Sequence, residues 1–225
     1  NTQGEMNELA GPFSGQTVER CRQEILERLD EKGLLQQSNP YTHTVGHCDR
    51  CDSVIEPMIS KQWYISMSQL AEPAIKAVKT GEINIIPNRF ANVYFNWMEN
   101  IRDWPVSRQL WWGHQIPVWY CSTCPDPIVD YTNPLNCPSC GKGELTRDPD
   151  VLDTWFSSGL WPHSTLGWPD ETEDLDYYYP GSVMETGHDI LFFWVARMIM
   201  FGLHHMGKPP FHTVYLHGLV LDPAG

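Results

Sequence analysis

The chain has 225 residues, 41% of them hydrophobic, so it is long enough for one large or two small domains with a real core. Its formal net charge of −13 argues against general nucleic-acid binding, which needs basic residues opposite phosphates, although a local basic strip is compatible with it. We see no secretory signal and no apolar run of about 18 residues, and cysteines spaced as metal ligands indicate a reducing, cytoplasmic setting.

The first part of the chain, residues 1–64, is predicted to hold one helix between irregular segments. Glycines and a proline make residues 1–16 a turn-rich entry. Apolar residues at helical spacing predict a helix over 17–32, capped by Thr17 and ended by Gly33, with Cys21 as a core thiol on its apolar face. Residues 34–64 are expected to be irregular to β-like.

Two further helices are predicted before residue 115. One lies around 67–78 and ends near Gly81, and the other covers about 88–101. They lead into an aromatic block, residues 103–117, which contains Arg108. Guanidinium groups prefer carboxylates or phosphates, so Arg108 either pairs with Asp103 inside an aromatic cluster or receives an anionic ligand. Spacing alone leaves these alternatives open.

Residues 116–148 carry two Cys-x-x-Cys pairs that are close in sequence. Two, twelve and two residues separate Cys121, Cys124, Cys137 and Cys140, which is typical of a closed four-thiolate site for structural zinc. Iron in a rubredoxin-like site is the chemical alternative.

A third cysteine pair stands without a partner pair nearby. Cys48 and Cys51 form half of a second metal site, and His43 and His47 flank them as possible substitute ligands. A half-site of this kind suggests that the other half lies in a segment absent from this sequence.

The last part of the chain, residues 149–225, is predicted to contain a loop followed by a βαβ unit. The loop covers 165–181 and includes an acidic run, 170–176, expected to be solvated. A strand over 183–186, a long helix over 190–205 and a strand over 213–221 predict a parallel sheet, whose ligands bind at the carboxyl ends of its strands. The fold class is α/β: part of a doubly wound, Rossmann-like sheet, preceded by helices and carrying an inserted zinc knuckle.

Three sequence blocks, residues 103–117, 150–158 and 187–194, resemble in this order the valyl branch of the class I aminoacyl-tRNA synthetases, and the resemblance covers essentially the whole chain. It implies a return segment from the editing domain over 1–64, a helical connective region over 65–115, a zinc knuckle over 116–148 and the second half of the catalytic nucleotide-binding fold over 149–225. The parent enzyme is then expected to activate valine with ATP and transfer it to tRNA(Val).

The resemblance also assigns roles to individual residues. Trp155 and Trp194 match the walls of the valine side-chain pocket. Cys48 and Cys51 match half of one zinc site, and the four cysteines from Cys121 to Cys140 match a complete second site. The positions expected to meet the aminoacyl-adenylate are Thr186, Gly187, Asp189, His217 and Gly218.

Two of these assignments have structural alternatives. Asp189 is expected near the ribose hydroxyls, but it also suits a helix N-cap or first turn. His188 and His217 are divided between ligand contact and structural hydrogen bonding, whereas His204 and His205 are expected at the end of a helix.

The sequence also departs from the resemblance. It lacks the HIGH-type signature, and it stops where the lysine-rich KMSKS signature is expected to follow. Both signatures stabilise the phosphates of ATP, so we expect this chain alone to be catalytically incompetent and to need the N- and C-terminal parts of the same polypeptide. Valine-dependent pyrophosphate exchange by the purified chain would contradict this expectation.

The sequence admits two other interpretations. The alternative from another class is a free-standing zinc-binding RNA- or protein-interaction module derived from a synthetase. The strand-like run 214–221 needs neighbours and favours a fragment over such a module. The amino-acid sequence of residues 152–158 argues against membership of the isoleucyl branch.

Overall fold

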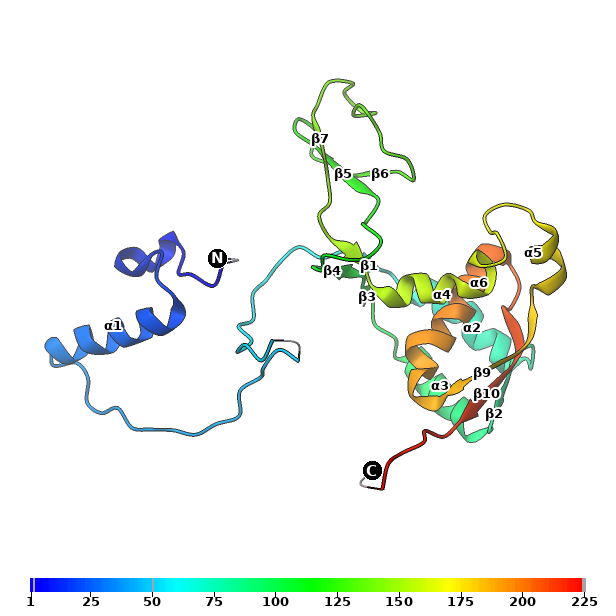
Figure 1. Ribbon diagram of the computed structural model, residues 1–225, viewed down its shortest axis with the longest axis horizontal. Helices are drawn as coiled ribbons and strands as arrows, with labels where there is room; N and C mark the ends of the chain where they lie inside the picture. The colour runs from blue at the N-terminus through cyan, green and yellow to red at the C-terminus, as the bar shows by residue number, and fades with distance from the viewer. Residues whose placement is uncertain (2, 50, 224–225) are drawn as a thin grey trace. The chain divides into compact units, whose positions relative to one another are not determined.

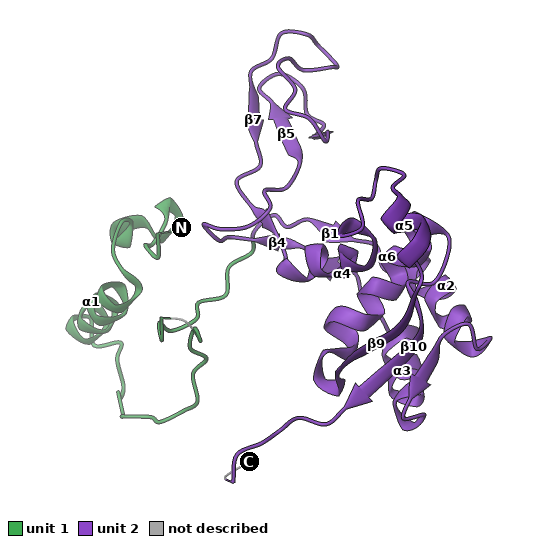
Figure 2. Cartoon of the chain, turned by 45° about the vertical axis from the view of Figure 1, so that its right-hand side comes forward, with its two compact units in different colours: residues 1–59 green, residues 60–225 purple. Residues whose placement is uncertain are grey.

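We describe residues 1, 3–49 and 51–223 from a computed structural model. The chain divides into two compact units, Asn1–Ile59 and Ser60–Gly225, which are coloured separately in Figure 2. Within the described residues, no helix combines the length and hydrophobicity needed to cross a membrane.

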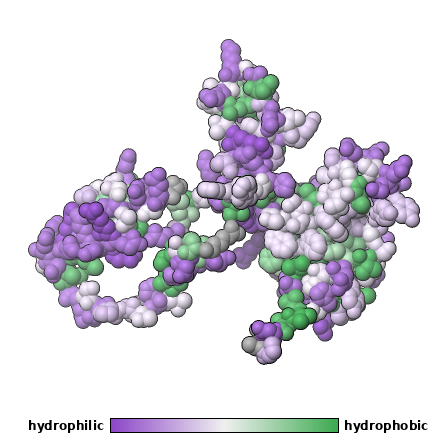
Figure 3. Space-filling model, viewed as in Figure 1, coloured by the Kyte–Doolittle hydropathy of each residue, from purple (hydrophilic) through white to green (hydrophobic). Residues whose placement is uncertain are grey.

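The first unit contains a 3-10 turn, η1 (Glu8–Phe13), and one α-helix, α1 (Val18–Glu31). The Thr17 hydroxyl accepts a hydrogen bond from the Arg20 N–H and caps α1, as predicted. Cys21 is buried, which confirms its position on the apolar face. Figure 3 shows a largely hydrophilic surface over α1, in keeping with its many charged residues.

The second unit is built around a parallel sheet of three strands, in the order β2 (Asn84–Ile86), β10 (Phe211–His217) and β9 (Gly181–Gly187). Val214 of β10 lies between Ile85 and Met184 in register, and all three are buried on the same face. The predicted βαβ unit is therefore confirmed, because β9 and β10 are adjacent and parallel.

Helices α2 (Ser68–Lys79), α3 (Arg89–Glu99) and α6 (Ala196–Met206) lie beside the sheet (Figure 1). α4 (Thr154–Ser164) packs against α6, and α5 (Glu173–Tyr178) lies near one end of the sheet (Figure 1). Ala71, Ala74 and Ala77 form the buried stripe of α2, and small side chains there allow α6 to approach closely. The predicted helices over about 67–78 and 88–101 are confirmed.

Short antiparallel pairings complete the unit. β1 (Tyr64–Ile65) pairs with β3 (Trp104–Pro105), and β4 (Ser107–Arg108) pairs with β8 (Val151–Leu152). A separate sheet has three strands, β6 (Ile128–Val129), β5 (Val118–Cys121) and β7 (Leu145–Arg147), and the clustered cysteines lie at the end of β5 and in the connecting segments.

Three predictions about elements were wrong. The segment 165–181 is not loop throughout, because α5 lies within it: Thr172 caps this helix, and its acidic residues occupy a first turn where the helix dipole favours them. The helix expected over 190–205 begins instead as a 3-10 turn, η2 (His188–Ile190), and a π turn, η3 (Leu191–Val195). The last strand ends at His217, just before Gly218, and does not reach 221.

The position of β10 also corrects the argument about an unpaired terminal strand. β10 is the central strand of its sheet, with β2 on one side and β9 on the other. The sequence did not reveal the neighbour β2 because this strand has only three residues, too few for a clear periodic pattern. Hydrophobic residues after β10, from Leu219 to Leu221, are exposed, and they appear green near the C-terminal end in Figure 3.

A histidine pair, one member of which is fully buried, joins α4 to α6. His163 has no exposed surface; its Nε2 lies 3.1 Å from Nδ1 of His205, and its own Nδ1 has no hydrogen-bond partner. The indole of Trp168 packs edge-on against it. Burial, reinforced by His205, lowers the pKa of His163 from 6.5 to about 4, so the folded chain holds this imidazole neutral.

We expect His163 to make the fold acid-sensitive. Between pH 6.5 and 4, His163 binds a proton in the unfolded chain but stays neutral in the folded chain. The free energy of unfolding therefore falls as the pH drops towards 4, by up to about 3 kcal/mol. Urea unfolding of wild type and His163→Phe between pH 7 and 4.5 measures this contribution as a difference. Exposed His204→Gln is the control and should keep the wild-type profile; a His163→Phe profile parallel to wild type would contradict the prediction.

Candidate functional site

Two Cys-x-x-Cys turns meet at the end of the β6–β5–β7 sheet. The sulfurs of Cys121, Cys124, Cys137 and Cys140 all lie within 4.8 Å of one another. The Cys121–Cys140 and Cys124–Cys137 sulfur distances are 3.7 and 3.8 Å. A tetrahedron with metal–sulfur bonds of about 2.3 Å has edges of about 3.8 Å, so this donor set fits one tetrahedral metal ion.

Hydrogen bonds around the sulfurs favour thiolates. The Thr123 hydroxyl lies 3.2 Å from the Cys140 sulfur and 3.3 Å from that of Cys121, and the Gly143 N–H donates to Cys140 at 3.3 Å. These contacts, led by Thr123, lower the pKa of Cys140 to about 5. The neighbouring sulfurs of Cys140 and Cys137 raise the pKa of Cys124 to about 12. A metal cation among the four sulfurs would stabilise the negative charge of all four thiolates, Cys124 included, because cysteine binds metals as the thiolate.

Gly143 is a structural requirement of this cluster. A Cβ atom at this position would lie 2.0 Å from the Cys121 sulfur and 2.9 Å from the Thr123 hydroxyl oxygen. The spacing of cysteines did not identify Gly143 or Thr123, because both act through the close approach of two turns that the sequence does not display.

The lone cysteine pair lies on a turn of the first unit. Cys51 contacts the Ser53 hydroxyl at 3.4 Å, which lowers the pKa of Cys51. His47 is engaged by its Nδ1 with the backbone oxygen of Asp52 at 2.7 Å. His43 stacks on the Tyr41 ring. Among residues 1, 3–49 and 51–223, the one group of three or more clustered metal-ligating side chains is that of Cys121 to Cys140, so a metal at Cys48 and Cys51 stays a prediction.

Asp153 is the hub that holds the aromatic block to α4. Its Oδ1 accepts the Trp155 N–H at 3.1 Å and so caps α4, while its Oδ2 accepts from Trp104 Nε1 at 2.9 Å and Arg108 at 2.7 Å. The Arg197 guanidinium lies 3.6 Å from the centre of the Trp104 ring and 3.9 Å from Asp153 Oδ2. Sequence analysis missed Asp153 and Arg197 as partners, although Asp153 stands before a helix where an N-cap residue is favoured.

The carboxylate partner of Arg108 differs from the one in the structural alternative. Arg108 forms an ion pair with Asp153, whose Oδ2 also accepts a hydrogen bond from the Trp104 indole. Asp103 instead accepts a hydrogen bond from the Met67 N–H, at 3.1 Å, where α2 begins.

Trp155 and Trp194 lie where α4 packs against η3. The Trp155 ring stacks on Phe193 at 5.7 Å, and the Trp194 ring lies 6.1 Å from that of Trp161. Trp194 Nε1 donates to the Ser158 carbonyl at 2.9 Å. That carbonyl lacks its usual helical donor because Pro162, four residues on, has no N–H. Both indoles are half-buried and fixed against the same helix.

The remaining predicted site residues gather at the carboxyl ends of β9 and β10. Gly187 and His217 are paired in register. Thr186 is buried, whereas Asp189 and Gly218 are exposed. A Cβ on Gly187 would lie 2.5 Å from Asp189 Oδ1, so glycine allows this carboxylate to fold back over the strand end.

The histidines of this region have structural contacts as well. His217 lies 3.5 Å from Glu185 through Nε2, and its Nδ1 is 2.8 Å from the Gly218 oxygen. His188 packs edge-on against Phe90. Asp189 lies in the first turn of η2, as in the structural alternative. His204 and His205 occupy the last turn of α6, as predicted.

Comparison with known proteins gives consistent results. The family described as tRNA synthetases class I (I, L, M and V) matches residues 16–134 and 126–225. The chain is 62% identical to the valine–tRNA ligase of Dehalococcoides mccartyi over 98% of its length and 25% of the relative's, and 56% identical to that of Clostridium tetani over 100% and 26%. It thus spans about a quarter of the length of these relatives.

A solved structure shows the same fold at lower identity. Mycobacterium tuberculosis methionyl-tRNA synthetase bound by methionyl-adenylate matches with a TM-score of 0.53 and 16% identity, over 79% of this chain and 30% of that one. This likeness supports the mixed α/β fold with its parallel sheet.

Proposed function

The chain belongs to the class I tRNA synthetases of the isoleucine, leucine, methionine and valine group, and from this membership we propose that it is part of a ligase that activates valine with ATP and transfers it to tRNA(Val). One observation carries the proposal: the 62% identity to a valine–tRNA ligase over 98% of the chain. In the first step the valine carboxylate would attack the α-phosphorus of ATP, the bond to the β-phosphate would break and pyrophosphate would leave; a tRNA hydroxyl would then attack the valyl carbonyl and AMP would leave. Both steps would be promoted by positioning and charge stabilisation.

In this proposal, Trp155 and Trp194 are walls of the valine pocket. Their support is the packing of η3 on α4, where the Trp194–Ser158 hydrogen bond fixes one indole against the helix that carries the other. Rigid aromatic walls make a narrow apolar slot. Such a slot excludes larger side chains but discriminates against an isostere with an added hydroxyl by only about a hundredfold, so an enzyme of this kind requires editing.

The strand ends supply the proposed adenylate surface. Thr186, Gly187, Asp189, His217 and Gly218 are the residues concerned. Parallel sheets bind ligands at the carboxyl ends of their strands, and the register of Gly187 with His217 brings two such ends together. The exposed carboxylate of Asp189 is suited to accept hydrogen bonds from ribose hydroxyls.

The sheet itself supports a doubly wound architecture in the whole protein. Ile86, Tyr215 and Val183 are 44%, 49% and 60% exposed on the face opposite the helices. All-parallel sheets are normally covered on both faces. We therefore propose a second helical layer over this face, supplied by other parts of the same polypeptide, with residues 1–64 as a return segment from an editing domain and 65–115 as the connective region.

The metal in the cysteine cluster is proposed to be structural zinc. Four thiolates leave no open coordination position for substrate, and zinc prefers this tetrahedral sulfur set. The ion would stiffen the knuckle of residues 116–148 without taking part in the reaction. A reducing, cytoplasmic setting is part of the proposal, since cysteines that are to ligate a metal must stay out of disulfides.

A chimera tests the function. The matching quarter of the Dehalococcoides mccartyi enzyme is replaced by this chain, and amino-acid-dependent exchange between pyrophosphate and ATP is measured with valine, isoleucine, leucine and methionine. We expect exchange with valine at a rate close to that of the parent enzyme. A folded chimera that prefers another of these amino acids would contradict the proposal.

A further inference from the structure

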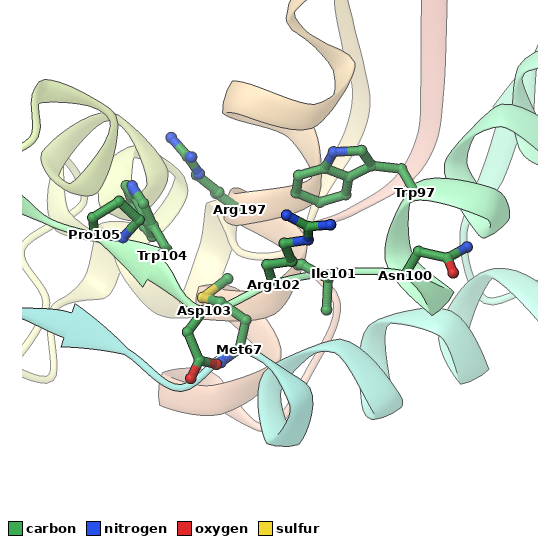
Figure 4. A pocket seen from close by; sticks show the side chains of 9 residues that line it. All are labelled: Met67, Trp97, Asn100, Ile101, Arg102, Asp103, Trp104, Pro105 and Arg197. Carbon is green, nitrogen blue, oxygen red and sulfur yellow. The ribbon is translucent and has the colours of Figure 1, made fainter. Parts of the chain in front are cut away.

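A cavity of about 360 Å³ in the second unit shares no lining residue with the proposed valine and adenylate sites. It is bounded by the end of α3, the segment leading into β3, the start of α2 and one side chain of α6 (Figure 4). Its lining residues are Met67, Trp97, Asn100, Ile101, Arg102, Asp103, Trp104, Pro105 and Arg197. None of these is a residue of the cysteine cluster or of the strand ends.

One wall of the cavity includes the buried guanidinium of Arg197, whose charge and hydrogen-bond donors are only partly satisfied by neighbouring groups. The Arg197 side chain is 8% exposed, and its Nε and Nη1 have no hydrogen-bond partner. The nearest carboxylate, Asp153, is 3.9 Å away, and its Oδ2 already accepts from Arg108 and Trp104. Burial lowers the pKa of Arg197 to about 10, which leaves the guanidinium charged at neutral pH.

A second cation completes a positive lining. Arg102 is exposed, and Figure 4 shows its side chain extending towards Trp97 on the same cavity as Arg197. The one lining carboxylate, Asp103, has its Oδ1 engaged with the Met67 N–H. The cavity therefore carries two guanidinium groups against one carboxylate, in a chain whose net charge is −13.

We propose that this cavity binds a small oxyanion, a carboxylate or a phosphate, which accepts hydrogen bonds from Arg102 at the mouth and is attracted by the charge of the buried Arg197, whose guanidinium lies over the Trp104 ring (Figure 4). Guanidinium groups form strong charge-assisted hydrogen bonds with both kinds of oxyanion. The rings of Trp97 and Trp104 exclude water from part of the lining, which strengthens the attraction. Trp97 is held in place by stacking on Phe192 at 4.9 Å, so this wall exists before a ligand arrives.

The test is a titration of the 225-residue chain with sodium phosphate and, separately, sodium acetate, with sodium chloride keeping the ionic strength constant. The indole N–H signal of Trp97 in nitrogen–proton NMR spectra reports on the cavity, and exposed Trp111 is the remote reference. We expect a saturable shift at Trp97 with at least one of the two anions and none at Trp111. The preferred anion identifies the ligand class.

Two exposed arginines give matched variants that should both fold. Arg102→Gln removes the cation at the mouth and should weaken anion binding about tenfold, the usual effect of losing a hydrogen bond to a charged group. Arg22→Gln on α1 makes the same charge change in the first unit and should bind as wild type does. Shifts that never saturate with either anion, or equal affinities in the two variants, would overturn the proposal.

Discussion

Cys137→Ser is expected to abolish tight zinc binding by this chain. Cys137 is buried, and its sulfur lies 3.8 Å from that of Cys124 inside the four-sulfur cluster. Structural zinc sites bind with about 10–16 kcal/mol of free energy at neutral pH, and this binding is coupled to folding of the segment that holds the ion. Loss of one thiolate should therefore unfold the knuckle of residues 116–148 as well as release the metal.

Elemental analysis and hydrogen exchange measure the two effects. Wild type should hold one zinc per chain and Cys137→Ser none, with loss of amide protection in β5 and β7 but not in β9 and β10. The double variant Cys48→Ser/Cys51→Ser is the matched control and should keep its zinc, because that pair lies in the first unit outside the cluster. Retention of tightly bound zinc by Cys137→Ser would show that the four sulfurs do not form the site.

Asp153→Ala is expected to destabilise the second unit by about 3–5 kcal/mol. This change removes the cap of α4 and the acceptor for Trp104 and Arg108, and it leaves the buried Arg197 without a nearby carboxylate. Breaking a buried ion pair from one side costs this much because the other charge stays behind uncompensated.

Urea unfolding followed by tryptophan fluorescence measures the loss. Asp170→Ala removes an exposed carboxylate and should change the free energy of unfolding by less than about 0.5 kcal/mol. Asp153→Asn keeps the size of the side chain and its capping oxygen, so its loss should fall between the two. Equal stabilities of Asp153→Ala and Asp170→Ala would contradict the role of Asp153 as a hub.

Regular periodicity explains which elements could be predicted from the sequence. α1, α2 and α3 have apolar residues at helical spacing. Burial alternates along most of β10, and in β9 it alternates only from Met184 to Thr186. β2 escaped prediction because a strand of three residues has no period of its own and is specified by its pairing with β10. α5 escaped because acidic residues suit both a solvated loop and a helix N-terminus.

The cysteine cluster and the Asp153 contacts likewise include features that local sequence predicts and features that only tertiary packing creates. Cysteine spacing was sufficient to predict that these four sulfurs lie together, since two short turns place their own sulfurs. The contacts of Thr123 and Gly143 with those sulfurs depend on how the two turns meet. Likewise, Asp153 and Arg197 are 44 positions apart in the printed sequence, and only tertiary packing joins α4 to α6 and brings them together.

The most direct test of the proposed valine pocket is amino-acid selectivity in the chimera. The ratio of kcat/KM for valine to that for isoleucine is measured by pyrophosphate exchange for Trp194→Ala and for Trp161→Ala, a variant of the more exposed neighbouring indole. If Trp194 is a wall of the slot, its removal makes room for one more methylene. The valine preference should then fall by at least about tenfold, the usual worth of that group in an apolar pocket, while Trp161→Ala retains it. An unchanged ratio in an active Trp194→Ala chimera would contradict the account.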